Sequence, residues 1–172
     1  MKVLFARFVA LAAAAIAATT LSTAEPVRAD EALIARGEYL AHIMDCTGCH
    51  TPGSMSGKPD MARYLGGGDV GFQIPGLGIF WPPNLTSDEA TGLGSWSVED
   101  IVKAVRTGET PDGRILAPIM PVASYGKLSD DDAIALATFL KNLPAVSNDV
   151  PDPASGPEDA KAPYMTVIVP VP

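Results

Sequence analysis

The segment Cys46-Thr47-Gly48-Cys49-His50 carries two thiols three positions apart, with an imidazole directly after the second. This is the C-x-x-C-H pattern of covalent haem attachment. Each thiol can add to one vinyl group of the same porphyrin, and the adjacent histidine can then bind the iron through one imidazole nitrogen. These are the only two cysteines in the sequence, so no disulfide framework competes for them.

Two other uses of a cysteine pair remain as alternatives. A thiol–disulfide redox pair normally sits where a strand runs into a helix in a βαβ pattern, whereas this segment follows a helix-like one. A zinc site would need one or two more Cys or His ligands. The only other histidine is His42, four residues before Cys46, so we expect it to be a packing or surface residue and favour haem attachment.

A methionine on the opposite side of a haem iron would raise its potential and suit it to electron transfer. Met120 is the best candidate, because it stands between two predicted helices with Pro118 before it and Pro121 directly after it. Both prolines restrict the backbone, which would help to hold a thioether against iron. The alternative is a loop methionine that fills a gap. Four further methionines follow the N-terminal segment: Met44, Met55, Met61 and Met165.

The N-terminus has the pattern of a secretory signal. Lys2 and Arg7 precede an apolar run over residues 8–21, and small residues follow up to Ala24 and again up to Ala29. We predict a signal peptide over residues 1–24, with Ala29 as a second cleavage point. The run is short for a membrane span, so an uncleaved anchor ranks second. We therefore expect an exported protein with no stable membrane insertion after cleavage.

The charge of the chain limits its partners. The net charge of the sequence is −8, from 12 basic and 20 acidic residues. Cleavage after Ala24 would remove two basic residues and no acid, which lowers the charge to −10. Such a surface disfavours nucleic acid and anionic membranes and favours a basic partner surface. The alternative is that the acidity only keeps the protein soluble.

Hydrophobic spacing predicts three main helices. The first spans residues 30–44 with Asp30 as its cap, and contains Gly37, whose lack of a side chain suggests a close helix–helix contact. The second begins after Ser97, continues to about residue 106, and ends at Gly108. The third begins at Ser129 with three aspartates in its first turn, where the helix dipole favours acids, and runs to residue 143.

The remaining segments are predicted to be loops and an extended tail. Residues 51–78 and 110–127 show no sustained period and are rich in turn residues. Residues 144–163 are rich in Pro, Ala and Asp. The β-prone run over residues 165–169 could lie on the body, add an edge strand or dock on a partner; we favour self-docking or disorder over a partner site.

Taken together, these motifs resemble a class I c-type cytochrome. The sequence is most similar to the haem domains of cytochrome subunits that serve periplasmic alcohol, aldehyde and gluconate dehydrogenases. It departs from them in having one haem motif, where those subunits usually carry two or three such domains. The matching segments are Cys46–His50, Pro83-Asn84-Leu85-Thr86-Ser87-Asp88, Thr91–Ser97, Arg106-Thr107-Gly108, Asp112-Gly113, Met120-Pro121 and Leu128-Ser129-Asp130.

The resemblance implies an all-α, class I cytochrome c fold over residues 30–144, with about three main helices and long loops around one covalent haem c, followed by a tail over residues 145–172. It implies that the first and last helices cross near Gly37. Cys46 and Cys49 would form the thioethers, and His50 and Met120 would bind the iron. Trp81, Trp96, Arg114 and Tyr125 are candidates for lining the haem or bonding its propionates, with plain packing or surface roles as the alternative.

The resemblance also implies a partner for the ligand histidine and a function. The His50 ring should donate its other N–H to a backbone carbonyl, with Pro82 and Pro83 as the candidates. Haem c is attached outside the cytoplasm in bacteria, which agrees with the predicted export. We expect a periplasmic one-electron carrier, not an enzyme, between a dehydrogenase donor and a cytochrome or oxidase acceptor. The alternatives are a fixed subunit of a dehydrogenase complex, a haem sensor or peroxidase with an open sixth position, and a thiol redox module.

Overall fold

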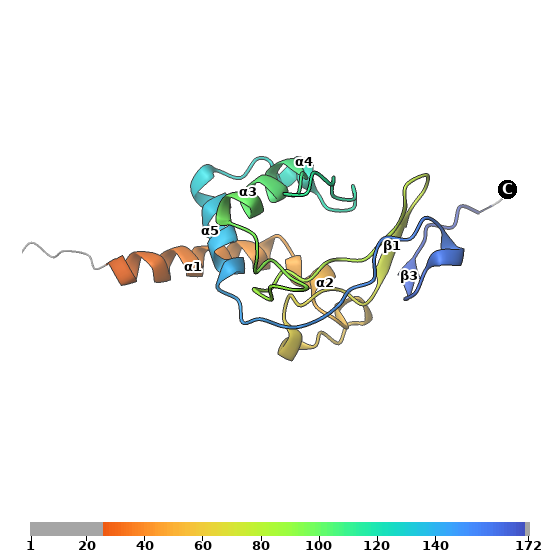
Figure 1. Ribbon diagram of the computed structural model, residues 1–172, viewed down its shortest axis with the longest axis horizontal. Coiled ribbons are helices and arrows are strands. Elements are labelled where there is room, and N and C mark those ends of the chain that lie inside the picture. Colours follow the sequence, from red (N-terminus) through yellow and green to blue (C-terminus); the bar gives the residue numbers. More distant parts are fainter. Residues whose placement is uncertain (1–25, 171–172) are drawn as a thin grey trace, which may run out of the picture.

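The computed structural model describes residues 26–170, so the predicted signal peptide lies outside the described residues. Three longer helices and two short ones form the main body (Figure 1). The helices are α1 (Pro26–Ile43), α2 (Cys46–His50), α3 (Val98–Thr107), α4 (Val122–Tyr125) and α5 (Asp130–Lys141), with single 3-10 turns at Ser54–Ser56, Met61–Arg63 and Pro157–Asp159.

The first and last helices cross at Gly37, as the family resemblance implies. A Cβ atom built on Gly37 would overlap the backbone oxygen of Ala135 and lie 2.6 Å from Cβ of Phe139. The α1 backbone therefore lies directly on α5, with no room for a side chain between them. The main core forms around this crossing, with Leu40 and Leu136 among its buried residues.

The helix ends follow the predicted signals except at the start of α1. Ser97 and Asp100 form a capping box at α3, which ends at Gly108 with a left-handed φ of 76°. At α5, the Ser129 side chain accepts a hydrogen bond from the Asp132 backbone, and the helix ends two residues short of the predicted residue 143. Because α1 begins at Pro26, Asp30 lies inside the helix and the prediction that it is the cap is wrong.

A small sheet corrects the all-α prediction. Its strands are β1 (Gly71–Ile74), β2 (Gly78–Phe80) and β3 (Tyr164–Met165), in the order β2-β1-β3. β1 is antiparallel to β2 and parallel to β3, with Phe72 opposite both Phe80 and Met165. Strands of two to four residues are too short to show a period of two, which is why residues 71–74 were predicted to be loop.

The C-terminal tail lies on the body of the protein and completes this sheet (Figure 1). Ile79 and Ala154 exchange two backbone hydrogen bonds of 2.8 and 3.0 Å. The indole nitrogen of Trp81 donates to the backbone oxygen of Pro163 across 3.0 Å. Of the possibilities left open by the sequence, Tyr164–Met165 adds an edge strand, whereas residues 167–169 are about four-fifths exposed.

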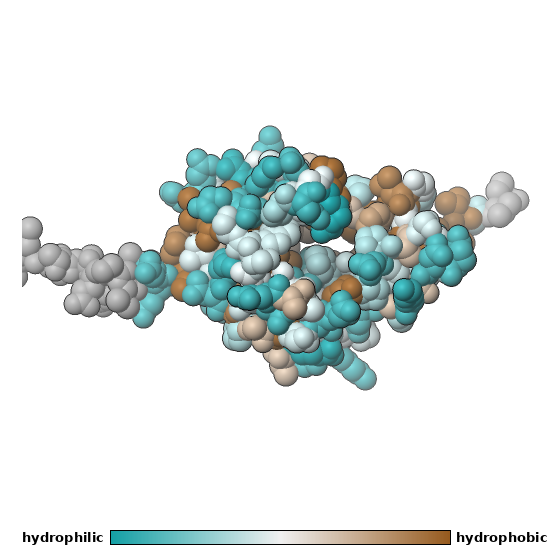
Figure 2. Space-filling model, in the orientation of Figure 1, coloured by the Kyte–Doolittle hydropathy of each residue, from teal (hydrophilic) through white to brown (hydrophobic). Residues whose placement is uncertain are grey.

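The surface is mostly hydrophilic, with apolar patches toward the end of the molecule that carries the sheet and the tail (Figure 2). Large exposed apolar side chains include Leu77, Ile115, Val167 and Ile168. Of the helices within residues 26–170, none has both the length and the apolar character needed to cross a membrane.

Candidate functional site

One helical turn presents all three residues of the C-x-x-C-H motif. Asp45, in the left-handed conformation with φ 54°, separates α1 from this turn and redirects the chain. A Cβ atom on Gly48 would lie 2.5 Å from a carboxylate oxygen of Asp45, so the Asp45 side chain packs against this turn. Cys46, Cys49 and His50 all lie on one short helix, α2.

The two thiols lie in surroundings that suppress ionisation. Cys46 is buried and Cys49 is half-buried. Burial raises the pKa of Cys46 to about 11 and also raises the pKa of Cys49, with the nearby Asp45 carboxylate adding to both shifts. Redox-active cysteine pairs have lowered pKa values. The environment of these thiols therefore weighs against the thiol–disulfide alternative.

His50 is buried and its ring is oriented by the backbone. Its Nδ1 lies 2.8 Å from the backbone oxygen of Pro83, one of the two carbonyls predicted from the sequence. Because a carbonyl oxygen can only accept, Nδ1 carries the hydrogen and Nε2 keeps its lone pair. Burial lowers the pKa of His50, which favours the neutral imidazole. A neutral ring with one nitrogen held by a backbone carbonyl is the usual form of a metal-binding histidine.

A glycine run closes over this turn from the side. The Gly67 backbone N–H donates to the His50 oxygen across 2.8 Å, and the Leu65 N–H donates to the Thr51 hydroxyl across 2.9 Å. A Cβ atom on Gly68 would overlap the backbone oxygen of Cys49. The loop over residues 65–68 is thus held against the backbone of the motif.

Met120 lies in the loop before α4 and is half-buried. Pro121, directly after it, is the N-cap residue of α4. At the other end of α4, the Tyr125 hydroxyl donates to the Met44 backbone oxygen across 2.8 Å. The segment that carries Met120 is thereby tied to the residues just before Cys46. The role of Met120 as an iron ligand stays a prediction.

The other candidate residues are placed in different surroundings. Trp81 belongs to a second small core with Ile79 and Ala154, and its indole N–H is engaged by the tail. Trp96 is half-buried and packs against the main core beside the start of α3. Of the four residues proposed for haem contact, Tyr125 has a hydrogen bond to Met44, two residues before the attachment turn.

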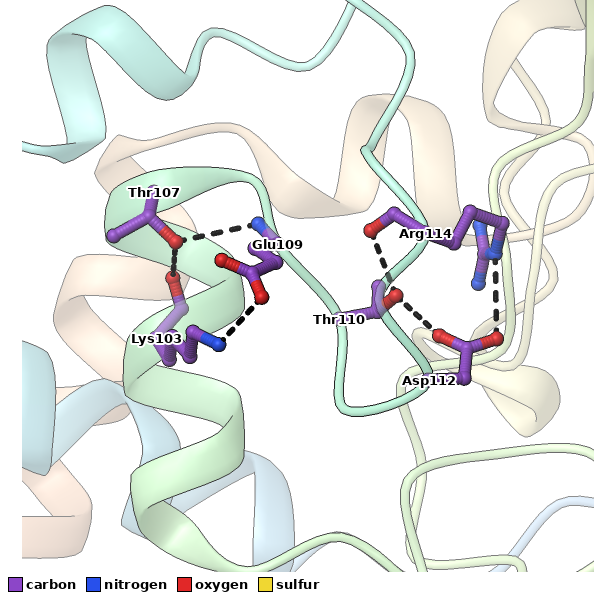
Figure 3. A network of polar contacts seen from close by, with 6 residues as sticks. All are labelled: Lys103, Thr107, Glu109, Thr110, Asp112 and Arg114. Atoms are coloured by element: carbon purple, nitrogen blue, oxygen red, sulfur yellow. Dashed lines mark hydrogen bonds and ion pairs between the residues drawn. The ribbon is translucent and has the colours of Figure 1, made fainter.

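Arg114 lies on the exposed loop between α3 and α4 (Figure 3). Its Nε is 3.9 Å from a carboxylate oxygen of Asp112, and its backbone oxygen is 2.8 Å from the buried hydroxyl of Thr110. The same hydroxyl contacts the Asp112 carboxylate. Arg114 thus has an acidic neighbour within its own loop, and its proposed role toward a propionate stays a prediction.

His42 is exposed on α1, as expected of a surface residue. Within residues 26–170 no three His, Cys, Asp or Glu side chains gather where they could hold a metal ion, so the zinc alternative finds no further ligand there. The donor set of α2 instead fits haem c: two thiols, at positions 46 and 49, and one free imidazole nitrogen, at position 50, on a single turn.

Sequence reasoning missed the role of Asn84. It is almost completely buried and its side chain makes four hydrogen bonds directly behind Pro83. The Pro83-Asn84-Leu85-Thr86 segment was part of the resemblance, but nothing in the residues themselves pointed to these hydrogen bonds. Two of the partners, Thr86 and Thr91, are near in sequence, whereas Val146 lies 62 positions away.

Comparison with known proteins agrees with this geometry. A family model described as "Cytochrome c" matches residues 34–144. The chain is 38% identical over 144 residues to the cytochrome c subunit of the quinone alcohol dehydrogenase of Gluconobacter oxydans (strain 621H), which covers 82% of this chain and 28% of that protein. It is 38% identical over 134 residues to the gluconate 2-dehydrogenase cytochrome c subunit of Pantoea cypripedii, covering 74% and 28%.

A third relative is a diheme cytochrome c-type protein of Cereibacter sphaeroides, 31% identical over 151 residues, with 84% of this chain and 48% of that protein covered. The chain thus spans less than a third of the two dehydrogenase subunits and about half of the diheme protein.

Proposed function

Because this chain belongs to the cytochrome c family, we propose that it is a periplasmic electron carrier with one covalently bound haem c that accepts electrons from a dehydrogenase. The haem supplies the chemistry, since its iron can take up and release one electron. The protein supplies attachment, axial ligands and a partly dry environment. One C-x-x-C-H motif in the sequence supports a single haem.

Each residue of α2 has a distinct role in this proposal. The sulfur atoms of Cys46 and Cys49 tether the porphyrin, and Nε2 of His50 binds the iron. The backbone oxygen of Pro83 holds the His50 ring at 2.8 Å and strengthens it as a ligand. Met120 would supply a sulfur ligand to the iron. With two protein ligands on the iron, no position would remain for a substrate, which favours an electron carrier over a catalyst.

The observation that carries the proposal is the buried His50 ring, oriented by Pro83 and flanked by the two thiols of one turn. A thiol redox module would have no need of an oriented imidazole with a free Nε2. The raised pKa of Cys46 also keeps this thiol protonated, whereas a thiol redox module needs a reactive thiolate.

The test is expression of the full chain together with a haem c maturation system. We expect a red protein, a pyridine haemochrome spectrum of haem c, and a mass increase that corresponds to one haem. A double variant Cys46→Ala/Cys49→Ala should lose the covalent haem. A control is Ser54→Ala, because the buried Ser54 hydroxyl has no hydrogen-bond partner among residues 26–170. A colourless wild-type protein would contradict the proposal.

A second candidate is a fixed subunit of a dehydrogenase complex. The similarity to the cytochrome c subunits of alcohol and gluconate dehydrogenases favours it. Affinity purification of the tagged full chain from its native host separates the two. A fixed subunit would be recovered in a constant ratio with a dehydrogenase at high ionic strength, whereas a free carrier would be recovered alone, because transient redox contacts are small and are weakened by salt.

A further inference from the structure

The side chain of Asn84 is a saturated hydrogen-bonding centre in the interior. It is 1% exposed. Its oxygen accepts from the Thr86 backbone N–H at 2.9 Å and from the Thr86 hydroxyl at 2.8 Å. Its nitrogen donates to the Thr91 hydroxyl at 3.0 Å and to the Val146 backbone oxygen at 2.6 Å. A side-chain amide offers two donors and two acceptor lone pairs, so all four are used.

Asn84 sits next to the carbonyl that orients His50. The Pro83 oxygen, which lies 2.8 Å from Nδ1 of His50, belongs to the peptide group that joins Pro83 to Asn84. A peptide group is planar, so fixing Asn84 limits the direction in which this carbonyl points. The four side-chain bonds of Asn84 therefore restrict the acceptor of the ligand histidine.

The tail contributes to this arrangement at two residues, Val146 and Asn148. The Val146 N–H donates to the Thr86 hydroxyl at 3.1 Å, and the Asn148 N–H donates to the Thr91 hydroxyl at 3.2 Å. Both acceptors are direct partners of Asn84. The tail thus supports Asn84 through three contacts: one direct, and two through its hydroxyl partners.

The tail also reaches the other segment that holds His50. The Asn148 side chain donates to the Gly66 backbone oxygen at 2.7 Å, and the next residue, Gly67, donates its N–H to the His50 oxygen at 2.8 Å. Asn148 therefore contacts the loop that fixes the backbone of His50, while Val146 contacts the side chain behind the carbonyl that fixes its ring.

The fit between the tail and the glycine loop is close. A Cβ atom on Gly66 would lie 2.9 Å from a methyl carbon of Val146, and one on Gly67 would lie 3.1 Å from the Asn148 side-chain nitrogen. Val146, Asn148 and Val150 are turned inward, whereas the residues between them are exposed. The tail therefore has a defined register on the body.

We propose that Asn84, Val146 and Asn148 are positioning residues for the His50 imidazole, so that the seated tail sets how strongly this ligand donates to iron. The proposal rests on the proposed function as a haem carrier. A hydrogen bond from Nδ1 makes an imidazole a more basic ligand, which favours the ferric state. Loosening that bond should shift the reduction potential to more positive values.

The sign of this shift separates positioning from a merely structural role. If these residues only stabilised the fold, their loss would admit water near the iron. Water favours the more highly charged ferric state, which would make the potential more negative. A positive shift is therefore the signature of a weakened His50 hydrogen bond.

The test uses the full chain with haem attached. Asn84→Ala and Asn148→Ala are compared with Asn142→Ala, an exposed asparagine that donates to Thr138 at the end of α5. In Asn84→Ala and in Asn148→Ala we expect a more positive reduction potential and about tenfold faster exchange of the His50 Nδ1 hydrogen. Asn142→Ala should show neither change. Asn148→Ala serves if Asn84→Ala does not fold.

An unchanged or more negative potential would overturn the inference, and so would unchanged exchange of the ring hydrogen. If the wild-type protein takes no haem, the proposed function fails. Exchange of the same ring hydrogen, measured by NMR on the haem-free chain, then decides the positioning role: faster exchange in Asn148→Ala supports it, and equal exchange overturns it.

Discussion

The hydroxyl of Tyr125 donates a hydrogen bond to the backbone oxygen of Met44 across 2.8 Å, although 81 positions separate the two residues. Met44 is two residues before Cys46, and Tyr125 ends the short helix that follows Met120. One contact thus joins the chain just before the attachment turn to the segment that carries the proposed distal ligand.

This contact predicts an effect of alkaline pH on stability. Burial raises the pKa of Tyr125 from 10.0 to about 12, with smaller contributions from the nearby cysteines and Asp45. Because the folded pKa lies above the unfolded one, the stabilisation is complete below pH 10 and is lost as the pH rises from 10 towards 12. Tyr125→Phe should lower the free energy of unfolding by about 1 kcal/mol at pH 8, and this gap should narrow above pH 10.

Urea unfolding of both proteins at a series of pH values measures the gap. Tyr39→Phe, at a tyrosine that is 53% exposed, is the control and should show no such narrowing. A gap that stays constant up to pH 12 would contradict the prediction.

The helix crossing predicts that Gly37→Ala is destabilising. Alanine is favoured over glycine within a helix by about 1 kcal/mol. Here its methyl group would overlap the Ala135 backbone, so we expect a net loss of about 2–3 kcal/mol in the free energy of unfolding. The measurement is urea denaturation.

Gly57→Ala is the comparison for this change. At Gly57 an added Cβ would meet nothing within 4 Å, and only its φ of 73° is unfavourable. The loss there should be about 1 kcal/mol. If the two variants were equally stable, the close approach of the helices would carry no energetic weight.

The tail contacts predict a change in protease sensitivity. Trp81→Phe removes the hydrogen bond to Pro163 together with part of the packing of the buried indole. A loss of at least about 1 kcal/mol should raise the opening of the tail at least about fivefold. Limited trypsin digestion, followed by mass spectrometry, should show faster cleavage after Lys161. Trp96→Phe, which packs on the main core, should leave that rate unchanged; equal rates in both variants would argue against the contact.

The ligand assignment predicts the effect of Met120→Ala. Loss of the thioether should lower the reduction potential and open the iron to added ligands such as carbon monoxide. In the ferric spectrum, the weak methionine–iron charge-transfer band should disappear. Met61→Ala, at an exposed methionine, is the control. An unchanged spectrum in Met120→Ala would rule out this assignment.

The features predictable from sequence were those set by nearby residues. Ser97 with Asp100 and Ser129 with its aspartates mark helix starts, because a cap bonds within its own first turn. Gly37 predicted a close helix–helix contact, because glycine inside a helix is destabilising unless its lack of a side chain allows close packing. The family resemblance predicts a backbone carbonyl as acceptor for the His50 ring N–H, with Pro82 and Pro83 as the candidates. In the structure the acceptor is Pro83.

The features missed depend on contacts between distant segments. β1 pairs with a strand near the C-terminus, and its own four residues carry no pattern that reveals this. The extended character of the tail followed from its proline content, but its seating depends on the absence of side chains at Gly66 and Gly67. Asn84 likewise gains its importance only when Val146 is folded back onto it.

The parallel pairing of β1 with β3 has a consequence for the order of folding. The Trp81–Pro163 bond beside it spans 82 positions, and joining segments so far apart carries a loop-closure cost that slows such contacts. The helices, whose bonds are local, can form sooner. We therefore expect the local turn at Cys46–His50 to form before the last strand is seated on the sheet.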